Sequence, residues 1–330
     1  MKGGSPLLFI CRFCGNDEDS SEAEYDSIRN GFWCSCCDGY TYLDPETLQH
    51  RFTLILEDDQ GKNSPLPQCK TRLNKRASPL RYPGGKSKII PIILSLLQAD
   101  STRTLVGAYA GGASVELSLL MAGIIDELIL NDLDFGIYAL FWTIKHAPFE
   151  LLQRIQNTTP THEDFFSAQA VLKSDYAYCN IFEAAWAQLL VNRLAYSGIY
   201  KANPLGGRMG SKKDLLSRWN PENLCKRISR IHRVSDRITL HNMDACQLIE
   251  EYYWCDKTTI YLDPPYACKG KQLYRCYYNR EDHIELCMLL ESLYQGMPGA
   301  DIILMYDKDP LIEEIYTLPT IEHFSRVYSA

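Results

Sequence analysis

The chain has 330 residues, of which 46% are hydrophobic and 23% charged, and its formal net charge is −7. This length allows a full core without disulfides, and the lack of any apolar run of about 18 residues argues against a membrane span. The apolar stretch before Cys11 is too short for a signal peptide, so we expect a cytoplasmic protein with reduced cysteines. The acidic net charge argues against a nonspecific nucleic-acid binder.

Four cysteines near the N-terminus have the spacing of metal ligands. Cys11 and Cys14 form one CxxC pair, Cys34 and Cys37 form a second, and 19 residues separate the pairs. Each pair can present two thiolates to one side of a tetrahedral Zn²⁺. We therefore predict a structural zinc ribbon within residues 1–62, in which Cys36 is a competing ligand. Four core or redox cysteines are the alternative interpretation.

The charge of this first segment bears on what the ribbon contacts. Residues 1–62 contain twelve Asp+Glu and five Lys+Arg. This acidity favours a protein partner or a purely structural role over DNA contact. Residues 63–78 follow as a polar, basic linker.

Beyond the linker, strand-like and helix-like segments alternate. Their patterns predict strands at 104–106, 127–130, 238–240, 259–262 and 301–305, and helices at 114–122, 135–145 and 280–294. This alternation favours an α/β fold with a parallel, Rossmann-like sheet. Residues 146–235 interrupt the alternation, and we expect them to form an inserted, mostly helical domain.

A glycine-rich turn follows the first of these strands. Ala110, Gly111 and Gly112 lead from the strand into a helix, and glycines there let the backbone approach a ligand closely. Asp132 ends the next strand, 21 residues after Gly111, a distance that suits an acid binding ribose hydroxyls. Together these features predict a nucleoside-cofactor site. A plain structural turn, with Asp132 as a helix N-cap, is the alternative.

The tetrapeptide Asp263-Pro264-Pro265-Tyr266 follows the apolar strand at 259–262. Two prolines fix the backbone and remove amide donors, so the Asp263 carboxylate and the Pro264 carbonyl become two acceptors in a rigid frame. Such a frame suits the two donors of an exocyclic amino group, and Tyr266 offers a face on which an extruded base can stack. Taken alone, the tetrapeptide could be a turn, but its position after a buried strand favours catalysis.

The predicted insert carries a local excess of positive charge. Between Arg193 and Arg233 there are ten Lys+Arg and two Asp+Glu, and such a block can neutralise phosphates even in an acidic protein. A solvated basic face is the alternative. We expect the DNA-contacting residues of the insert, together with a second basic run beside the tetrapeptide, to be Arg193, Tyr196, Lys201, Asn203, Arg208, Lys212, Lys213, Lys269 and Lys271.

These motifs and their order resemble the Dam-like, alpha-type DNA adenine methyltransferases, which depend on S-adenosylmethionine. The segment 79–86 is similar to the family's N-terminal cofactor motif, and Asp244 is similar to its acid for the cofactor adenine. The resemblance covers roughly residues 78–330 and leaves out the ribbon. It implies that the cofactor binds at Tyr82, Lys86, Ala110, Gly111, Gly112, Asp132, Asp244 and Asp263.

The function implied by this resemblance is site-specific methylation of the N6 amino group of an adenine flipped out of double-stranded DNA. Residues 79–145 and 236–330 would form the catalytic domain, and residues 146–235 the target-recognition insert. The family usually has an acid where this chain has Gly107. That departure keeps open the alternative of a catalytically weak DNA-binding relative that recruits partners through its ribbon. Methylation of RNA or of a protein amide is a third hypothesis.

Overall fold

The computed structural model describes most of the chain from Thr102 onward and parts of the N-terminal region. The described residues are 8–11, 14–15, 17–19, 24–26, 31–37, 39–42, 50–58, 64, 66–67, 71, 73–74, 76–81, 86–97, 102–267, 270–296 and 299–325. The predicted site residues Tyr82 and Lys269 lie outside them.

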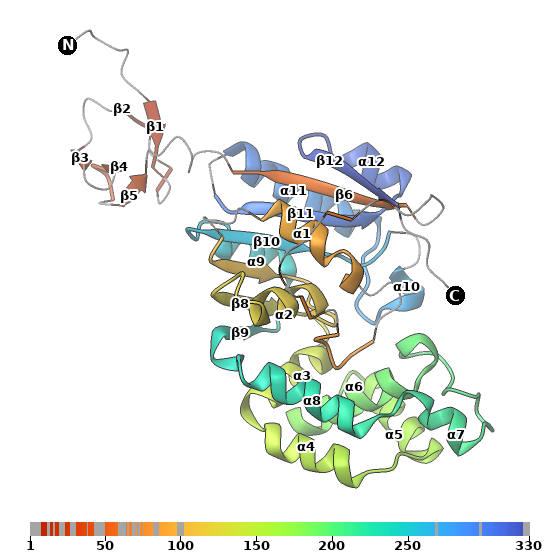
Figure 1. Ribbon diagram of the computed structural model, residues 1–330. Coiled ribbons are helices and arrows are strands. Elements are labelled where there is room, and N and C mark those ends of the chain that lie inside the picture. Colours follow the sequence, from red (N-terminus) through yellow and green to blue (C-terminus); the bar gives the residue numbers. More distant parts are fainter. Residues whose placement is uncertain are drawn as a thin grey trace.

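A seven-stranded parallel sheet forms the centre of the fold, in the strand order β12-β6-β11-β10-β7-β8-β9 (Figure 1). Because every pairing is parallel, the carboxyl ends of all seven strands meet at one edge. All five predicted strands are present, so the predicted α/β class is confirmed. The strands are β6 (Phe52–Asp58), β7 (Thr104–Gly107), β8 (Glu127–Asn131), β9 (Ile238–His241), β10 (Thr258–Leu262), β11 (Asp301–Asp307) and β12 (Thr320–Ser325).

Strand β6 departs from the predicted organisation. Residues 52–58 were expected in the ribbon segment, but in the structure they pair in parallel with β11 on one side and β12 on the other. Leu54, Ile55 and Leu56 are fully buried, because both faces of a parallel sheet are covered by helices. The ribbon segment therefore ends before β6, and β6 belongs to the central sheet.

Helices cover both faces of this sheet. One face packs against α1 (Ile90–Leu96), α2 (Ser114–Met121) and α3 (Phe135–His146), and the other against α9 (Ala245–Tyr252), α11 (Arg280–Gly296) and α12 (Pro310–Ile315). Successive strand residues alternate between the two sides, so Leu105 joins the first core and Val106 the second. The helices predicted at 114–122, 135–145 and 280–294 are thereby confirmed.

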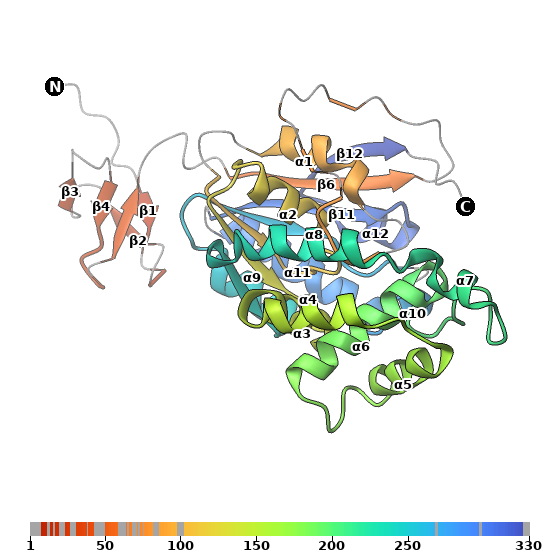
Figure 2. The same ribbon diagram turned by 60° about the horizontal axis from the view of Figure 1, so that its bottom comes forward.

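The segment between α3 and β9 is helical, as expected. It contains α4 (Pro148–Asn157), α5 (His162–Lys173), α6 (Ile181–Leu194), α7 (Lys212–Leu215) and α8 (Pro221–His232), and Figure 2 shows α4, α6 and α8 beside α3, which they contact. Thr161 and Asp164 begin α5 with a reciprocal capping box. Buried residues of α4, α5, α6 and α8 belong to the same hydrophobic cluster as those of α1, α2 and α3, so these helices share a core with the sheet domain.

Short antiparallel strands make up the described N-terminal region. β1 (Leu8–Ile10) pairs with β2 (Asp17–Asp19), and β4 (Gly31–Trp33) pairs with both β3 (Glu24–Asp26) and β5 (Tyr40–Tyr42). Two small hairpin-like units of this kind suit a four-cysteine knuckle fold. Among the described residues, no helix is long and apolar enough to cross a lipid bilayer.

Candidate active site

A cavity of about 340 Å³ opens at the carboxyl edge of the sheet. It lies where the connections from β7 and β10 run to opposite sides, the usual ligand site of an open parallel sheet. Its lining includes all the described residues predicted to bind the cofactor, which are Lys86, Ala110, Gly111, Gly112, Asp132, Asp244 and Asp263. Pro265 and Tyr266 also line it, whereas Pro264 is buried and is not part of the lining. Asp244 additionally caps α9 by accepting the Cys246 N–H at 2.8 Å.

Asp132 fixes the glycine-rich turn against the end of β8. Its carboxylate accepts the Gly111 N–H and the Asp134 N–H, each at 2.8 Å. Gly111 has a left-handed φ of 46°, which favours glycine at this turn. Burial and the neighbouring Asp134 raise the pKa of Asp132 to about 7. The helix N-cap considered for Asp132 is instead provided by Asp134, which accepts the Gly136 N–H at the start of α3.

Asp263 lies directly after β10, where a buried lysine contacts it. Lys86 Nζ is 3.3 Å from Asp263 Oδ1 and 2.9 Å from Glu57 Oε2, so the ammonium bridges two carboxylates. Burial raises the pKa of Asp263, while Lys86 lowers it and Glu57 raises it. The Asp263 side chain keeps 22% of its surface exposed, so it can still accept a hydrogen bond from a ligand in the cavity.

Tyr266 presents an aromatic ring beside this cluster. The ring lies edge-to-face with Tyr274, with 5.8 Å between centroids, and Lys86 Nζ is 5.3 Å from its centroid. An edge-on neighbour and a cation hold the ring in place while part of it borders the cavity. The arrangement can therefore hold a planar aromatic group close to Asp263.

Gly107 is the last residue of β7, and a side chain from α2 fills the space beside its Cα. A Cβ built on Gly107 would lie 3.0 Å from Glu116 Oε1, so the side chain of Glu116 on α2 covers this glycine. Glu116 is buried and lines the cavity, and burial raises its pKa to about 8. The site therefore has a carboxyl group at the end of β7 although residue 107 has none. This removes the observation that favoured a catalytically weak relative.

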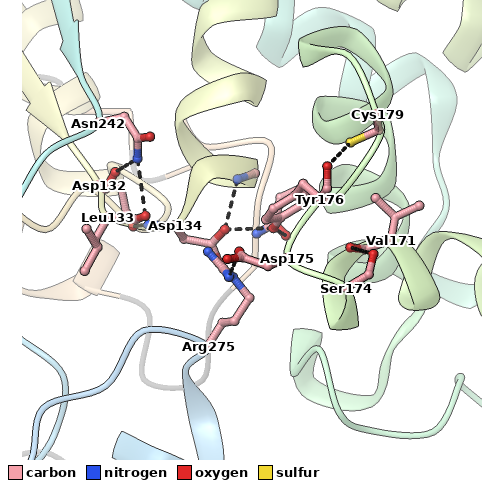
Figure 3. Close-up of polar contacts among 12 residues, drawn as sticks. Asp132, Leu133, Asp134, Val171, Ser174, Asp175, Tyr176, Cys179, Asn242 and Arg275 are labelled. Atoms are coloured by element: carbon pink, nitrogen blue, oxygen red, sulfur yellow. Dashed lines mark hydrogen bonds and ion pairs between the residues drawn. The ribbon is translucent and has the colours of Figure 1, made fainter.

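Arg275 connects the segment after the tetrapeptide to the insert (Figure 3). Its Nε lies 3.0 Å from Asp134 Oδ2, a second nitrogen bonds Asp175, and the guanidinium lies over the Tyr176 ring at 5.0 Å. Tyr176 in turn donates to Asp134 Oδ1 at 2.7 Å. Arg275 follows Lys269 and Lys271 in the chain, but its side chain is only 15% exposed and forms contacts within the protein.

The residues predicted to contact DNA divide into two groups. Arg193 is buried in α6 and donates to the Arg218 carbonyl at 2.6 Å and 3.1 Å, so its predicted contact with DNA is replaced by a structural role. It faces inward because α6 is packed into the core along nearly its whole length. The remaining described candidates are exposed, and they are Tyr196, Lys201, Asn203, Arg208, Lys212, Lys213 and Lys271.

The four predicted zinc ligands come together in the N-terminal region. The sulfur atoms of Cys11, Cys14, Cys34 and Cys37 all lie within 4.8 Å of one another, with Cys11–Cys37 at 3.5 Å and Cys14–Cys34 at 3.6 Å. Tetrahedral zinc with Zn–S bonds of about 2.3 Å places its sulfurs roughly 3.8 Å apart, so the cluster is compatible with this metal. Cys36 lies outside the cluster, and its backbone N–H points to Cys34 Sγ at 3.4 Å.

Sequence reasoning missed Glu57, Glu116 and the role of Arg275. The only local signal for Glu57 was the apolar run of β6, which stands far from the other strands in the chain. Glu116 falls inside an apolar helix, where an acid that points to a cavity looks the same as one that points to solvent. Their importance depends on contacts between elements, which no local pattern records.

The family comparison agrees with this geometry. The model of the D12 class N6 adenine-specific DNA methyltransferases matches residues 82–329, which is more than half of the chain. The matched range contains the glycine-rich turn, Asp132, the helical insert and the tetrapeptide. It leaves out β6 and the cysteine cluster. No curated protein matches the chain.

Proposed function

Because the chain belongs to the D12 class N6 adenine-specific DNA methyltransferase family, we propose that it methylates an adenine flipped out of double-stranded DNA, with S-adenosylmethionine as methyl donor. One observation carries the detailed proposal. Asp263 and Tyr266 face the same cavity as the glycine-rich turn and Asp132. A nucleoside-type cofactor and a base held by the tetrapeptide would therefore meet at one edge of the sheet.

The chemistry of the lining suits this cofactor. The Gly111 turn lets the cofactor approach the backbone, Asp132 offers a carboxylate to ribose hydroxyls, and Asp244 offers one to the adenine amino group. When bound, S-adenosylmethionine supplies a methyl group activated by a positively charged sulfonium. Buried carboxyl groups in the cavity, Glu116 among them, suit a ligand that carries both a sulfonium and an ammonium.

The substrate adenine is held by acceptors and by stacking. The Asp263 carboxylate and the Pro264 carbonyl accept the two N–H groups of the exocyclic amine, which turns the nitrogen lone pair toward the methyl group. Tyr266 stacks on the base, and extrusion of the base makes its amino group reachable. With the donor bound, the S–CH3 bond would break as the N–CH3 bond forms, and the proton lost by the amine would leave along its hydrogen bond to the Asp263 carboxylate. These residues would then act through positioning and electrostatics, without a covalent enzyme intermediate.

The helical insert and the ribbon have separate roles in the proposal. In this proposal the exposed side chains of Lys201, Arg208, Lys212 and Lys213 contact phosphates, and the exposed side chains of Tyr196 and Asn203 contact bases. The four cysteines hold one structural Zn²⁺, because four thiolates leave no open coordination position for catalysis. The acidic ribbon segment serves a structural role or a protein partner. We propose residues 146–235 as the target-recognition unit.

Replacement of Asp263 tests the assigned role. Asp263→Ala should abolish methyl transfer to DNA while leaving duplex binding, measured by fluorescence anisotropy, within about threefold of wild type. Asp256→Ala is a control, because Asp256 lies before β10 at the opposite edge of the sheet. Methyl transfer retained by Asp263→Ala would rule out this carboxylate as the group that holds the amine.

A further inference from the structure

The strand β6 lies outside the range matched by the family model, yet it delivers a carboxylate to the active site. Its Glu57 is paired in register with Asp307 on β11 and with Phe324 on β12. The Glu57 carbonyl also accepts the Lys308 N–H at 2.9 Å. With neighbours on both sides, the backbone that carries Glu57 is fixed as firmly as any part of the sheet.

The side chain of Glu57 is directed at Lys86. Only 4% of the Glu57 side chain and 9% of the Lys86 side chain are exposed, and the Nζ–Oε2 distance is 2.9 Å. A buried ammonium needs charged or hydrogen-bonding partners, and here it has one on β6 and one after β10. The second partner is Asp263 Oδ1, at the longer distance of 3.3 Å.

We propose that Glu57 is a positioning residue for methyl transfer. By binding the Lys86 ammonium, Glu57 keeps this ammonium from forming a full ion pair with Asp263. This deepens the proposed function, on which it rests. With Glu57 present, Lys86 orients one oxygen of Asp263 and leaves the carboxylate basic enough to accept the adenine amine. Without Glu57, the ammonium would move fully onto Asp263 and compete with the amine.

Loss of the Glu57 charge should change the pKa of Asp263, and this change can be measured. Burial raises the pKa of Asp263, Lys86 lowers it, and Glu57 raises it. Removing the Glu57 charge should therefore lower that pKa. The charged and titratable groups that face Asp263 from the surrounding elements are Lys86, Glu57, Asp307, Glu116, Tyr261, Tyr266 and Tyr274. Because transfer needs ionised Asp263, the acid limb of kcat should move to lower pH when Glu57 is neutralised.

The test compares Glu57→Gln with Glu322→Gln in the full-length protein. Glu322 is an exposed acid on the neighbouring strand β12. We expect Glu57→Gln to lower kcat about tenfold, to leave KM for S-adenosylmethionine within about twofold, and to shift the acid limb of kcat to lower pH. Glu322→Gln should change none of these. Unchanged kcat and an unchanged acid limb in Glu57→Gln would overturn the proposal.

A second variant separates positioning from folding. Glu57→Asp keeps the charge on a shorter side chain, so it should restore the wild-type acid limb and much of kcat. Equal kcat losses in Glu57→Asp and Glu57→Gln, without any pH shift, would also overturn the proposal. NMR of ¹³C-labelled aspartate measures the pKa of Asp263 without requiring the protein to catalyse methyl transfer. It therefore tests the Glu57 effect even if wild-type protein fails to methylate DNA, which would count against the proposed function instead.

Discussion

Arg275 Nε lies 3.0 Å from Asp134 Oδ2, and this ion pair joins the segment after the Asp263–Tyr266 tetrapeptide to the N-cap of α3. The same arginine bonds Asp175 in the turn between α5 and α6. Asp175 and Tyr176 in that turn have φ values of 55° and 58°, an unfavourable conformation for side-chain-bearing residues. Arg275 thus holds a strained turn of the insert against the start of α3.

Loss of this arginine should destabilise the protein. Arg275→Ala leaves the Asp134 carboxylate largely buried without its ion-pair partner, at a cost of about 3 kcal/mol in the free energy of unfolding. Urea unfolding followed by circular dichroism measures this cost. Arg280→Ala, an exposed arginine at the start of α11, should change the stability by less than about 0.5 kcal/mol. Equal stability of the two variants would contradict the role given to Arg275.

Glu116 should govern the affinity for the cationic cofactor. Burial raises its pKa to about 8, so the group is mostly neutral at neutral pH and becomes a carboxylate as the pH rises. Affinity for S-adenosylmethionine, measured by calorimetry, should therefore increase from about pH 6.5 to about pH 8.5. Burial also raises the pKa of Asp132 to about 7, so part of the increase belongs to that residue.

Two variants isolate the part that belongs to Glu116. Glu116→Gln should weaken binding at pH 8.5 about tenfold and flatten the upper part of the pH profile. Glu127→Gln, an exposed acid at the opposite edge of the sheet, should bind as wild type does. Gly107→Asp should also impair binding, because its Cβ would lie 3.0 Å from the Glu116 carboxylate, and adding Glu116→Ala should relieve that clash. A pH profile unaltered in Glu116→Gln would refute this assignment.

The basic residues of the insert should separate into DNA contacts and structural residues. Lys212→Ala with Lys213→Ala removes two exposed charges, so duplex affinity should fall and the slope of log K against log salt should drop by about 1.8. Arg193→Ala instead leaves the Arg218 carbonyl without its donor and should cost about 1–3 kcal/mol of stability. A normal salt slope in the double lysine variant would show that α7 does not meet the phosphates.

The cysteine cluster predicts a selective dependence on zinc. Elemental analysis should find one zinc per chain, and Cys34→Ser should lose it because Cys34 lies within the cluster. Cys36→Ser is the matched control: its thiol lies outside the cluster, so zinc should be retained. Zinc lost in both variants, or found in neither wild type nor control, would be incompatible with a ribbon built on these four ligands.

Those features of the candidate site that depend on local sequence were predictable. The tetrapeptide at Asp263, the turn at Gly111 and the acid at Asp132 each follow a strand whose apolar pattern is plain, and parallel pairing then brings them to one edge. The four cysteines were predictable from spacing alone. These features depend on short-range constraints, so their residue types carry the information.

The remaining features depend on long-range packing. Strand β6 was missed because it directly follows the ribbon segment and a linker separates it from the other strands of the sheet. Its partners β11 and β12 lie more than 240 residues downstream. Arg193 was misplaced because its charge suggested solvent, whereas α6 is buried around most of its circumference. Glu57 and Glu116 acquire roles only through Lys86 and Gly107, which come from other elements.

The identity of the methylated nucleoside decides whether the protein transfers a methyl group to adenine in DNA. The protein would be incubated with tritiated S-adenosylmethionine and unmethylated duplex DNA, and the digested product separated into nucleosides. We expect the label to appear in N6-methyldeoxyadenosine and Asp263→Ala to incorporate none. Label in a methylated cytosine, or no label from a protein that binds both cofactor and DNA, would contradict it.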